Sequence, residues 1–138
     1  MPHDDLREDP RSDARERALS LLYEAESKDR PPHEVLASLP VRPAAGVQEL
    51  VEGVEAHQPE LDALIVEHAR NWSLERMPAI DRNVLRIALF ELIGRPDVPV
   101  PVVIDEAVEL AKRFSTDDSG RFVNGVLASV AKIARPPG

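Results

Sequence analysis

The sequence contains no cysteine among its 138 residues. Disulfide bonds and thiolate metal sites are therefore excluded, and an intracellular protein without redox chemistry is the plain interpretation. It also has no uninterrupted apolar run near the roughly eighteen residues that a membrane-spanning helix requires, and its N-terminus is polar and acidic. We therefore expect a soluble, cytoplasmic protein with no membrane segment.

Basic residues are in the minority, because 17 Lys and Arg stand against 25 Asp and Glu, for a net charge of -8. Proteins that bind nucleic acid over their whole surface gain most of their affinity by neutralising phosphates, so the charge argues against that class. Any nucleic-acid site must be a local patch. Residues 112–135 form one weakly basic stretch, with two acidic residues (Asp117, Asp118) and five basic ones: Lys112, Arg113, Arg121, Lys132 and Arg135.

Catalytic signatures are absent as well, since the sequence has neither a nucleophile motif nor a glycine-rich phosphate loop. Asp105 and Glu109 share one face of a predicted helix, as an acid–base pair would. Pairing of Glu109 with Lys112 and Arg113 explains the pattern without catalysis. The histidines are scattered along the chain, so we expect no metal site, no cofactor and no enzyme activity.

The most informative segment runs from Ile80 to Ile93, where apolar residues recur at intervals of three and four. This spacing predicts a helix with a wide apolar face, central in a small domain. Gly94 and the prolines that follow it stop this helix. A second helix then begins, with apolar positions between Val103 and Ala111.

The whole chain has thirteen prolines, and those outside the turn between these two helices divide the remaining chain into shorter helical pieces. A first helix is expected to begin with a cap at Asp9 or Ser12 and to bury a face between Ala14 and Ala25. Pro59 is expected to break the middle of the chain, which gives helices at 34–39, 44–56 and 60–69 and a short turn at 73–77.

The final helix is indicated by Ser115 with Asp118 three residues later, a capping-box pattern, and it should end near Arg135. No segment alternates with the period of a strand beside a hairpin signal. We therefore predict an all-α fold of about seven helices in a single domain at residues 9–135. Residues 1–8 have too few apolar groups to order and are expected to be mobile.

Two interpretations of Arg121 and Phe122 remain open. The ring of Phe122, near the start of the last helix, could stack on an unpaired base beside a phosphate contact from Arg121. The alternative is that Phe122 belongs to the core and Arg121 is solvated, and pattern alone favours it.

Four segments in this order and spacing resemble the NusB family of bacterial transcription antitermination factors: ARERALSLLYE at 14–24, IDRNVLRIALFEL at 80–92, DVPVPVVIDEAVELAKRF at 97–114 and DDSGRFVNGVL at 117–127. The resemblance covers nearly the whole chain after residue 11. It implies an all-helical fold of two packed bundles and no catalysis. It also implies binding of the single-stranded boxA RNA of ribosomal RNA leaders together with NusE, a ribosomal small-subunit protein, so that RNA polymerase reads through terminators.

The resemblance also implies site residues in this sequence. RNA contacts fall on the starts of the first and last helices, at Arg11, Arg15, Asp118, Arg121 and Phe122. Contacts to NusE fall on Tyr23, Glu75 and Asp81.

Two other functions are compatible with the same residues. A NusB-like domain also occurs fused to ribosomal RNA cytosine methyltransferases, but we expect no such enzyme because the chain is too short for an additional cofactor-binding sheet. The other alternative is a protein-only helical adaptor or homodimer without intrinsic RNA binding. The sequence does not decide the oligomeric state.

Overall fold

The computed structural model describes residues 10–70 and 72–136. Within these ranges it contains no strand and has seven helical elements: α2 (Pro10–Ser27), α3 (Pro32–Ala37), α4 (Ala45–His68), the 3-10 helix η1 (Leu74–Arg76), α5 (Ala79–Gly94), α6 (Val100–Phe114) and α7 (Asp117–Ala134). The predicted all-α fold is confirmed. The predicted mobile segment 1–8 and the alternative cap at Asp9 lie outside the described residues.

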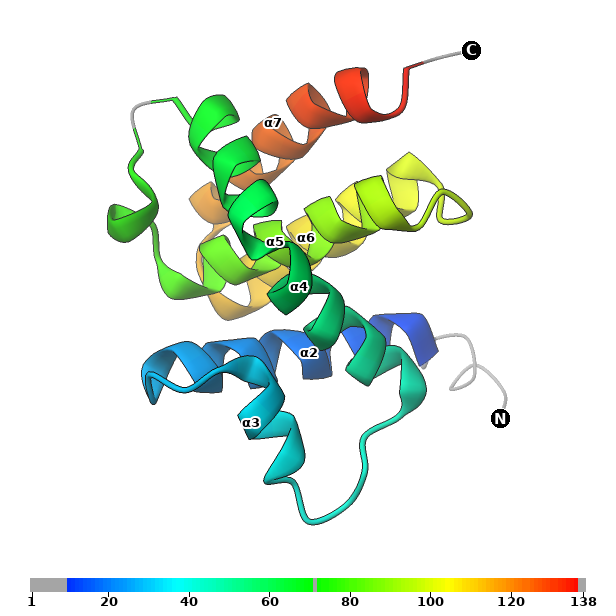
Figure 1. Cartoon of the computed structure of the whole chain (residues 1–138). Helices are drawn as coiled ribbons and strands as arrows, with labels where there is room; N and C mark the ends of the chain where they lie inside the picture. Colours follow the sequence, from blue (N-terminus) through cyan, green and yellow to red (C-terminus); the bar gives the residue numbers. More distant parts are fainter. Residues whose placement is uncertain (1–9, 71, 137–138) are drawn as a thin grey trace.

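The helices form two packed groups that share α4. In Figure 1, α2 and α3 lie below, α5, α6 and α7 lie above, and α4 runs from one group to the other. The start of α4 packs on α2, where Gly46 lies beside Ala14, and its end reaches α7, where His68 meets Ser129. The two bundles predicted from the family resemblance are therefore present.

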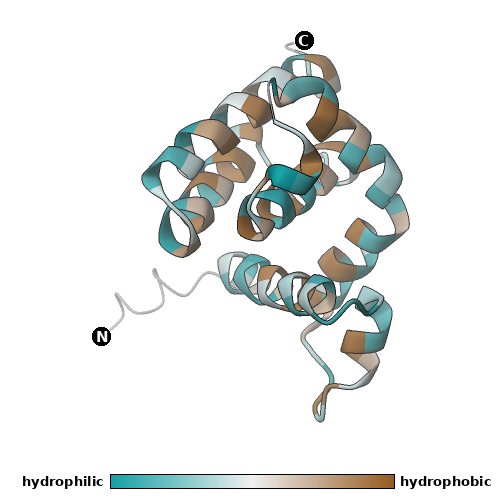
Figure 2. Cartoon of the chain, turned by 90° about the vertical axis from the view of Figure 1, so that its left-hand side faces the viewer, coloured by the Kyte–Doolittle hydropathy of each residue, from teal (hydrophilic) through white to brown (hydrophobic). Residues whose placement is uncertain are grey.

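Helix α5 is the centre of the molecule, as its spacing predicts, because it contacts α2, α4, α6 and α7. The apolar stripe extends almost all round this helix, which is typical of a helix enclosed by others. Figure 2 shows apolar and polar segments alternating along the surrounding helices. The largest fully buried side chains include Leu21, Leu61, Ile65, Leu85, Leu89, Leu92 and Leu127. No helix in the described ranges is both long and apolar enough to span a membrane.

The predicted break at Pro59 is wrong, because α4 continues through it as one helix of 24 residues. An interior proline costs about 3 kcal/mol through a lost hydrogen bond and a clash with the preceding turn. Packing on both sides offsets that cost: His57 stacks on Phe90 of α5 at 5.9 Å between ring centroids, and Leu61 is 1% exposed. Tertiary contacts therefore keep the helix continuous.

The cap of the last helix also differs from the prediction. Thr116, rather than Ser115, is the N-cap of α7, and its hydroxyl oxygen accepts a 3.0 Å hydrogen bond from the backbone N–H of Ser119. The hydroxyl of Ser115 instead lies 2.9 Å from that of Ser119. Both serine and threonine can cap a helix, so the choice between adjacent residues depends on where the chain enters α7.

Arg135, just after α7, holds the end of α5 in place. Its guanidinium donates to the backbone carbonyls of Leu92 and Glu91 at 3.0 Å, Arg95 at 2.7 Å and Val98 at 2.5 Å. These carbonyls lie at the end of α5 and in the turn that follows, where helix carbonyls lack partners within the helix. Arg135 thereby ties the α5–α6 turn to α7.

Candidate nucleic-acid interface

The start of α7 presents three of the residues predicted to contact RNA. Arg121 and Asp118 are both highly exposed and form an ion pair with each other one turn apart. Phe122 is half-buried, with part of its ring against the core and its centroid 6.1 Å from that of Trp72. The two interpretations of Phe122 are thus not exclusive, because the ring is anchored in the core at one end and lies beside an exposed aromatic at the other.

Arg15 occupies a different environment from the other predicted RNA contacts. Its side chain is 3% exposed and donates to Glu91 of α5 at 2.8 and 3.0 Å and to Glu106 of α6 at 3.1 Å. Burial alone would lower the pKa of Arg15, but hydrogen bonds and the charges of Glu91 and Glu106 outweigh it and raise the pKa above its ordinary value. The structure gives Arg15 an internal ion pair that joins three helices, so its guanidinium is not presented to a phosphate.

Arg11 is exposed in the first turn of α2. Farther along α2, Glu16 forms a 3.1 Å ion pair with Arg113, one residue before the end of α6. Because α7 begins shortly after Arg113, this pair brings α2 close to the turn that leads into α7. The two predicted RNA segments therefore flank α6. The sequence predicted that Arg113 would pair with Glu109, but in the structure it pairs with Glu16.

A groove of about 330 Å³ opens between the starts of α5 and α7, and we call it the Trp72 pocket. It is lined by Trp72, Met77, Asp81, Ser119 and Phe122, among others. Asp81 is 3% exposed, and its Oδ2 accepts a 2.7 Å hydrogen bond from the Ser119 hydroxyl. Its Oδ1 is buried without a hydrogen-bond partner. Asp81, predicted to contact NusE, therefore lies beneath the surface at the floor of this pocket.

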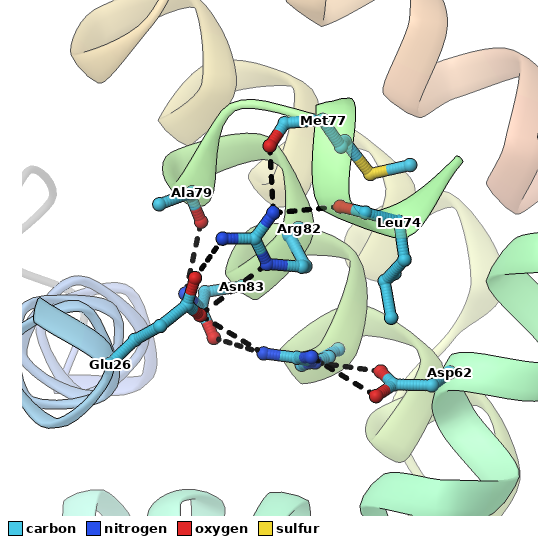
Figure 3. Close-up of polar contacts among 8 residues, drawn as sticks. Glu26, Asp62, Leu74, Met77, Ala79, Arg82 and Asn83 are labelled. Atoms are coloured by element: carbon cyan, nitrogen blue, oxygen red, sulfur yellow. Dashed lines mark hydrogen bonds and ion pairs between the residues drawn. The ribbon is translucent and has the colours of Figure 1, made fainter. Parts of the chain in front are cut away.

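The other two residues assigned to NusE are accessible. Tyr23 is 45% exposed on α2, and Glu75 is exposed on η1. Arg82 of α5 donates to the carbonyls of Leu74 and Met77 at 2.8 and 2.7 Å, which fixes both ends of η1 (Figure 3). Glu75 is thereby presented on a short helix that α5 holds in position.

Glu26 of α2 lies at the centre of the network drawn in Figure 3. It accepts from Arg82, from Asn83 at 3.1 Å and from Arg86 at 3.3 Å, while Arg86 also forms a two-point pair with Asp62 of α4 at 2.7 and 3.0 Å. Burial and the nearby charge of Arg86 lower the pKa of Arg82, yet an arginine remains charged at neutral pH. The network joins α2, α4 and α5.

The carboxylates and histidines considered from the sequence for acid–base catalysis or metal binding do not come together as a catalytic or metal site within the described residues. Asp105 and Glu109 line an open groove between α6 and α7 together with Lys112 and Arg121. The described part of the chain has no group of three or more side chains suited to hold a metal ion. His68 lies 2.7 Å from the Ser129 hydroxyl, which gives it a packing role between α4 and α7.

Sequence reasoning did not identify Trp72, Glu91 or Ser119 as parts of this region. Trp72 is the only tryptophan in the chain and lies a few residues before the central helix, ahead of η1, so its residue type and position could have indicated a role. Glu91 falls within the apolar run of α5, and a carboxylate there predicts a buried cationic partner. The role of Ser119 depends on α5 and α7 meeting, which no local pattern shows.

A model described as the NusB family matches residues 12–132 of the chain. The transcription antitermination protein NusB of Salinispora arenicola is 48% identical over 131 residues, which cover 90% of this chain and 96% of that protein. The NusB protein of Myxococcus xanthus is 46% identical over 137 residues, with 92% and 98% covered.

Solved structures agree with this similarity. The structure of T. maritima NusB matches with a TM-score of 0.81 at 35% identity, covering 90% of this chain and 92% of that one. A crystal structure of antitermination factors NusB and NusE in complex with dsRNA contains a chain that matches with a TM-score of 0.75 at 28% identity, covering 89% and 96%.

Proposed function

The chain belongs to the NusB family, and on this basis we propose that it is a transcription antitermination factor. It binds the single-stranded boxA RNA of ribosomal RNA leaders together with NusE and helps RNA polymerase to read through terminators. The observation that carries this proposal is the 48% identity to a NusB protein over 96% of that protein's length. The protein acts in the cytoplasm by binding, without catalysis or a cofactor, through a folded unit at residues 9–135.

RNA contacts are proposed for the exposed groups on both sides of α6. Arg11 and Arg121 supply phosphate contacts, Phe122 supplies a stacking surface, and Asp118 orients Arg121 through their ion pair. Arg15 is buried beneath this surface and stabilises it, because its ion pairs hold α2 against α5 and α6. Its contribution to RNA binding is therefore structural.

Contacts to NusE are proposed for Tyr23 and Glu75, which are both exposed. A partner is needed on electrostatic grounds, because a net charge of -8 opposes binding of a polyanion. NusE would supply the phosphate contacts that this chain lacks. We expect the protein alone to bind boxA RNA weakly and the complex with NusE to bind it well.

Fluorescence anisotropy with boxA RNA and a scrambled RNA, with NusE present and at several salt concentrations, tests the proposal. Arg121→Ala should flatten the logarithmic salt dependence by about 0.7, the value for one phosphate contact on a single strand. Arg17→Ala, at an exposed arginine of α2 outside the proposed surface, is the matched control. Equal binding to both RNAs would contradict the proposal and favour the protein-only adaptor.

A further inference from the structure

Asp81, which lines the Trp72 pocket, has one carboxylate oxygen that accepts no hydrogen bond. Asp81 is 3% exposed, Ser119 satisfies only its Oδ2, and Oδ1 is buried without a partner. A buried polar atom without a partner costs free energy on the order of 1 to 3 kcal/mol, and more for a charged group. Such atoms are rare in native proteins and call for an explanation. A ligand that brings an N–H donor would remove this cost.

The rest of the lining restricts the chemistry of that ligand. Asp81 and Asp118 both line the pocket, and no Lys or Arg does, so a phosphate is excluded. Trp72, which is 47% exposed, and Phe122 approach each other at 6.1 Å with their rings tilted by 54°. Unpaired RNA bases are recognised by stacking on aromatic side chains and by hydrogen bonds to their edges. The pocket offers both kinds of contact.

We propose that the Trp72 pocket takes one unpaired RNA base that carries an exocyclic amino group, with Oδ1 of Asp81 accepting one of its N–H groups. This inference rests on the proposed function and specifies which bases this part of the surface selects. Aspartate accepts in the same way from the N4 amino group of cytosine. Uracil has a carbonyl oxygen at that position, which the carboxylate repels.

Two further observations fit a base better than a protein side chain. Arg121 directly precedes Phe122 on α7 and is 76% exposed, so a phosphate that flanks a bound base can reach its guanidinium. The volume of about 330 Å³ is at the small end for ligand pockets and suits one ring system. Oδ1 lies below the surface. Trp72, at 47% exposed, is the more exposed of the two aromatic side chains in the lining and has the more room to move.

The fluorescence of Trp72 tests the proposal directly, because it is the only tryptophan in the chain. Oligocytidylate and oligouridylate of equal length carry the same charge and differ at the amino group. We expect oligocytidylate to quench Trp72 at roughly tenfold lower concentration, the effect of about one charge-assisted hydrogen bond. Asp81→Asn, whose amide can also donate to uracil, should abolish this preference.

Glu60→Gln is the matched control, because it also replaces a carboxylate by its amide, but at an exposed residue of α4 outside the pocket. An equal loss of preference in this variant would overturn the proposal in favour of general electrostatics. Weaker binding of NusE to Asp81→Asn, with the base preference unchanged, would overturn it in favour of a protein donor. If Asp81→Asn does not fold, the wild-type comparison decides, since equal quenching by both oligonucleotides is sufficient to reject the pocket.

The same protein is titrated with boxA RNA and NusE in parallel. Specific boxA binding without any cytosine preference at Trp72 would reject the pocket and leave the proposed function standing. If the protein with NusE does not bind boxA RNA specifically but Trp72 still shows the cytosine preference, the proposed function is rejected and the pocket is not. The two failures are therefore distinguishable.

Discussion

At the scale of single residues, Arg15 is predicted from the sequence to contact RNA, but in the structure it forms a buried ion pair with Glu91. Its buried pair with Glu91 predicts that Arg15→Ala lowers the free energy of unfolding by about 3 to 5 kcal/mol, because Glu91 would be left as a buried charge without its partner. Urea unfolding of wild type and variant measures this difference. Arg17→Ala, two residues along the same helix and exposed, should change it by less than about 0.5 kcal/mol. A stable Arg15→Ala variant with a flatter RNA salt dependence would instead support a phosphate contact.

At the scale of elements, two glycines inside helices should respond oppositely to alanine. A Cβ at Gly53 of α4 would lie 2.2 Å from the ring of Phe90 of α5, whereas one at Gly125 of α7 would meet nothing within 4 Å. Alanine gains about 1 kcal/mol of helix propensity at either site, but overpacking costs roughly 1 to 3 kcal/mol at Gly53 alone. We expect Gly125→Ala to raise the melting temperature and Gly53→Ala to lower it. Phe90→Leu should partly rescue Gly53→Ala, and additive effects of the two changes would contradict this packing.

At the scale of the whole molecule, Glu26 connects the α2–α3 group to the rest. It accepts from three residues of α5, so Glu26→Ala should loosen α2 and α3 while α6 and α7 keep their protection. Hydrogen exchange of backbone amides, followed helix by helix, measures this difference. Lys28→Ala, which removes an exposed ion pair with Glu24 just after the end of α2, should leave all helices unchanged. Uniform loss of protection along the chain would show that the two groups unfold as one unit.

The sequence by itself determined the helical class, the central position of α5 and most helix boundaries. These features depend on local spacing: the apolar positions between Ile80 and Ile93 recur with the helical period, and prolines with Gly94 limit where helices can begin and end. The family resemblance added the two bundles, and the structure has both. Periodicity and local chemistry act over a few residues, so one chain is enough to show them.

The tertiary structure alone decided the features in which distant segments meet. Pro59 stays within α4 because packing against α5 outweighs its local cost, and Arg15 is internal because Glu91 and Glu106, distant in sequence, converge on it. The Trp72 pocket likewise exists only where the starts of α5 and α7 come together around Asp81. The net strength of such contacts depends on burial, and burial depends on which helices lie opposite one another. No local pattern in the chain contains that information.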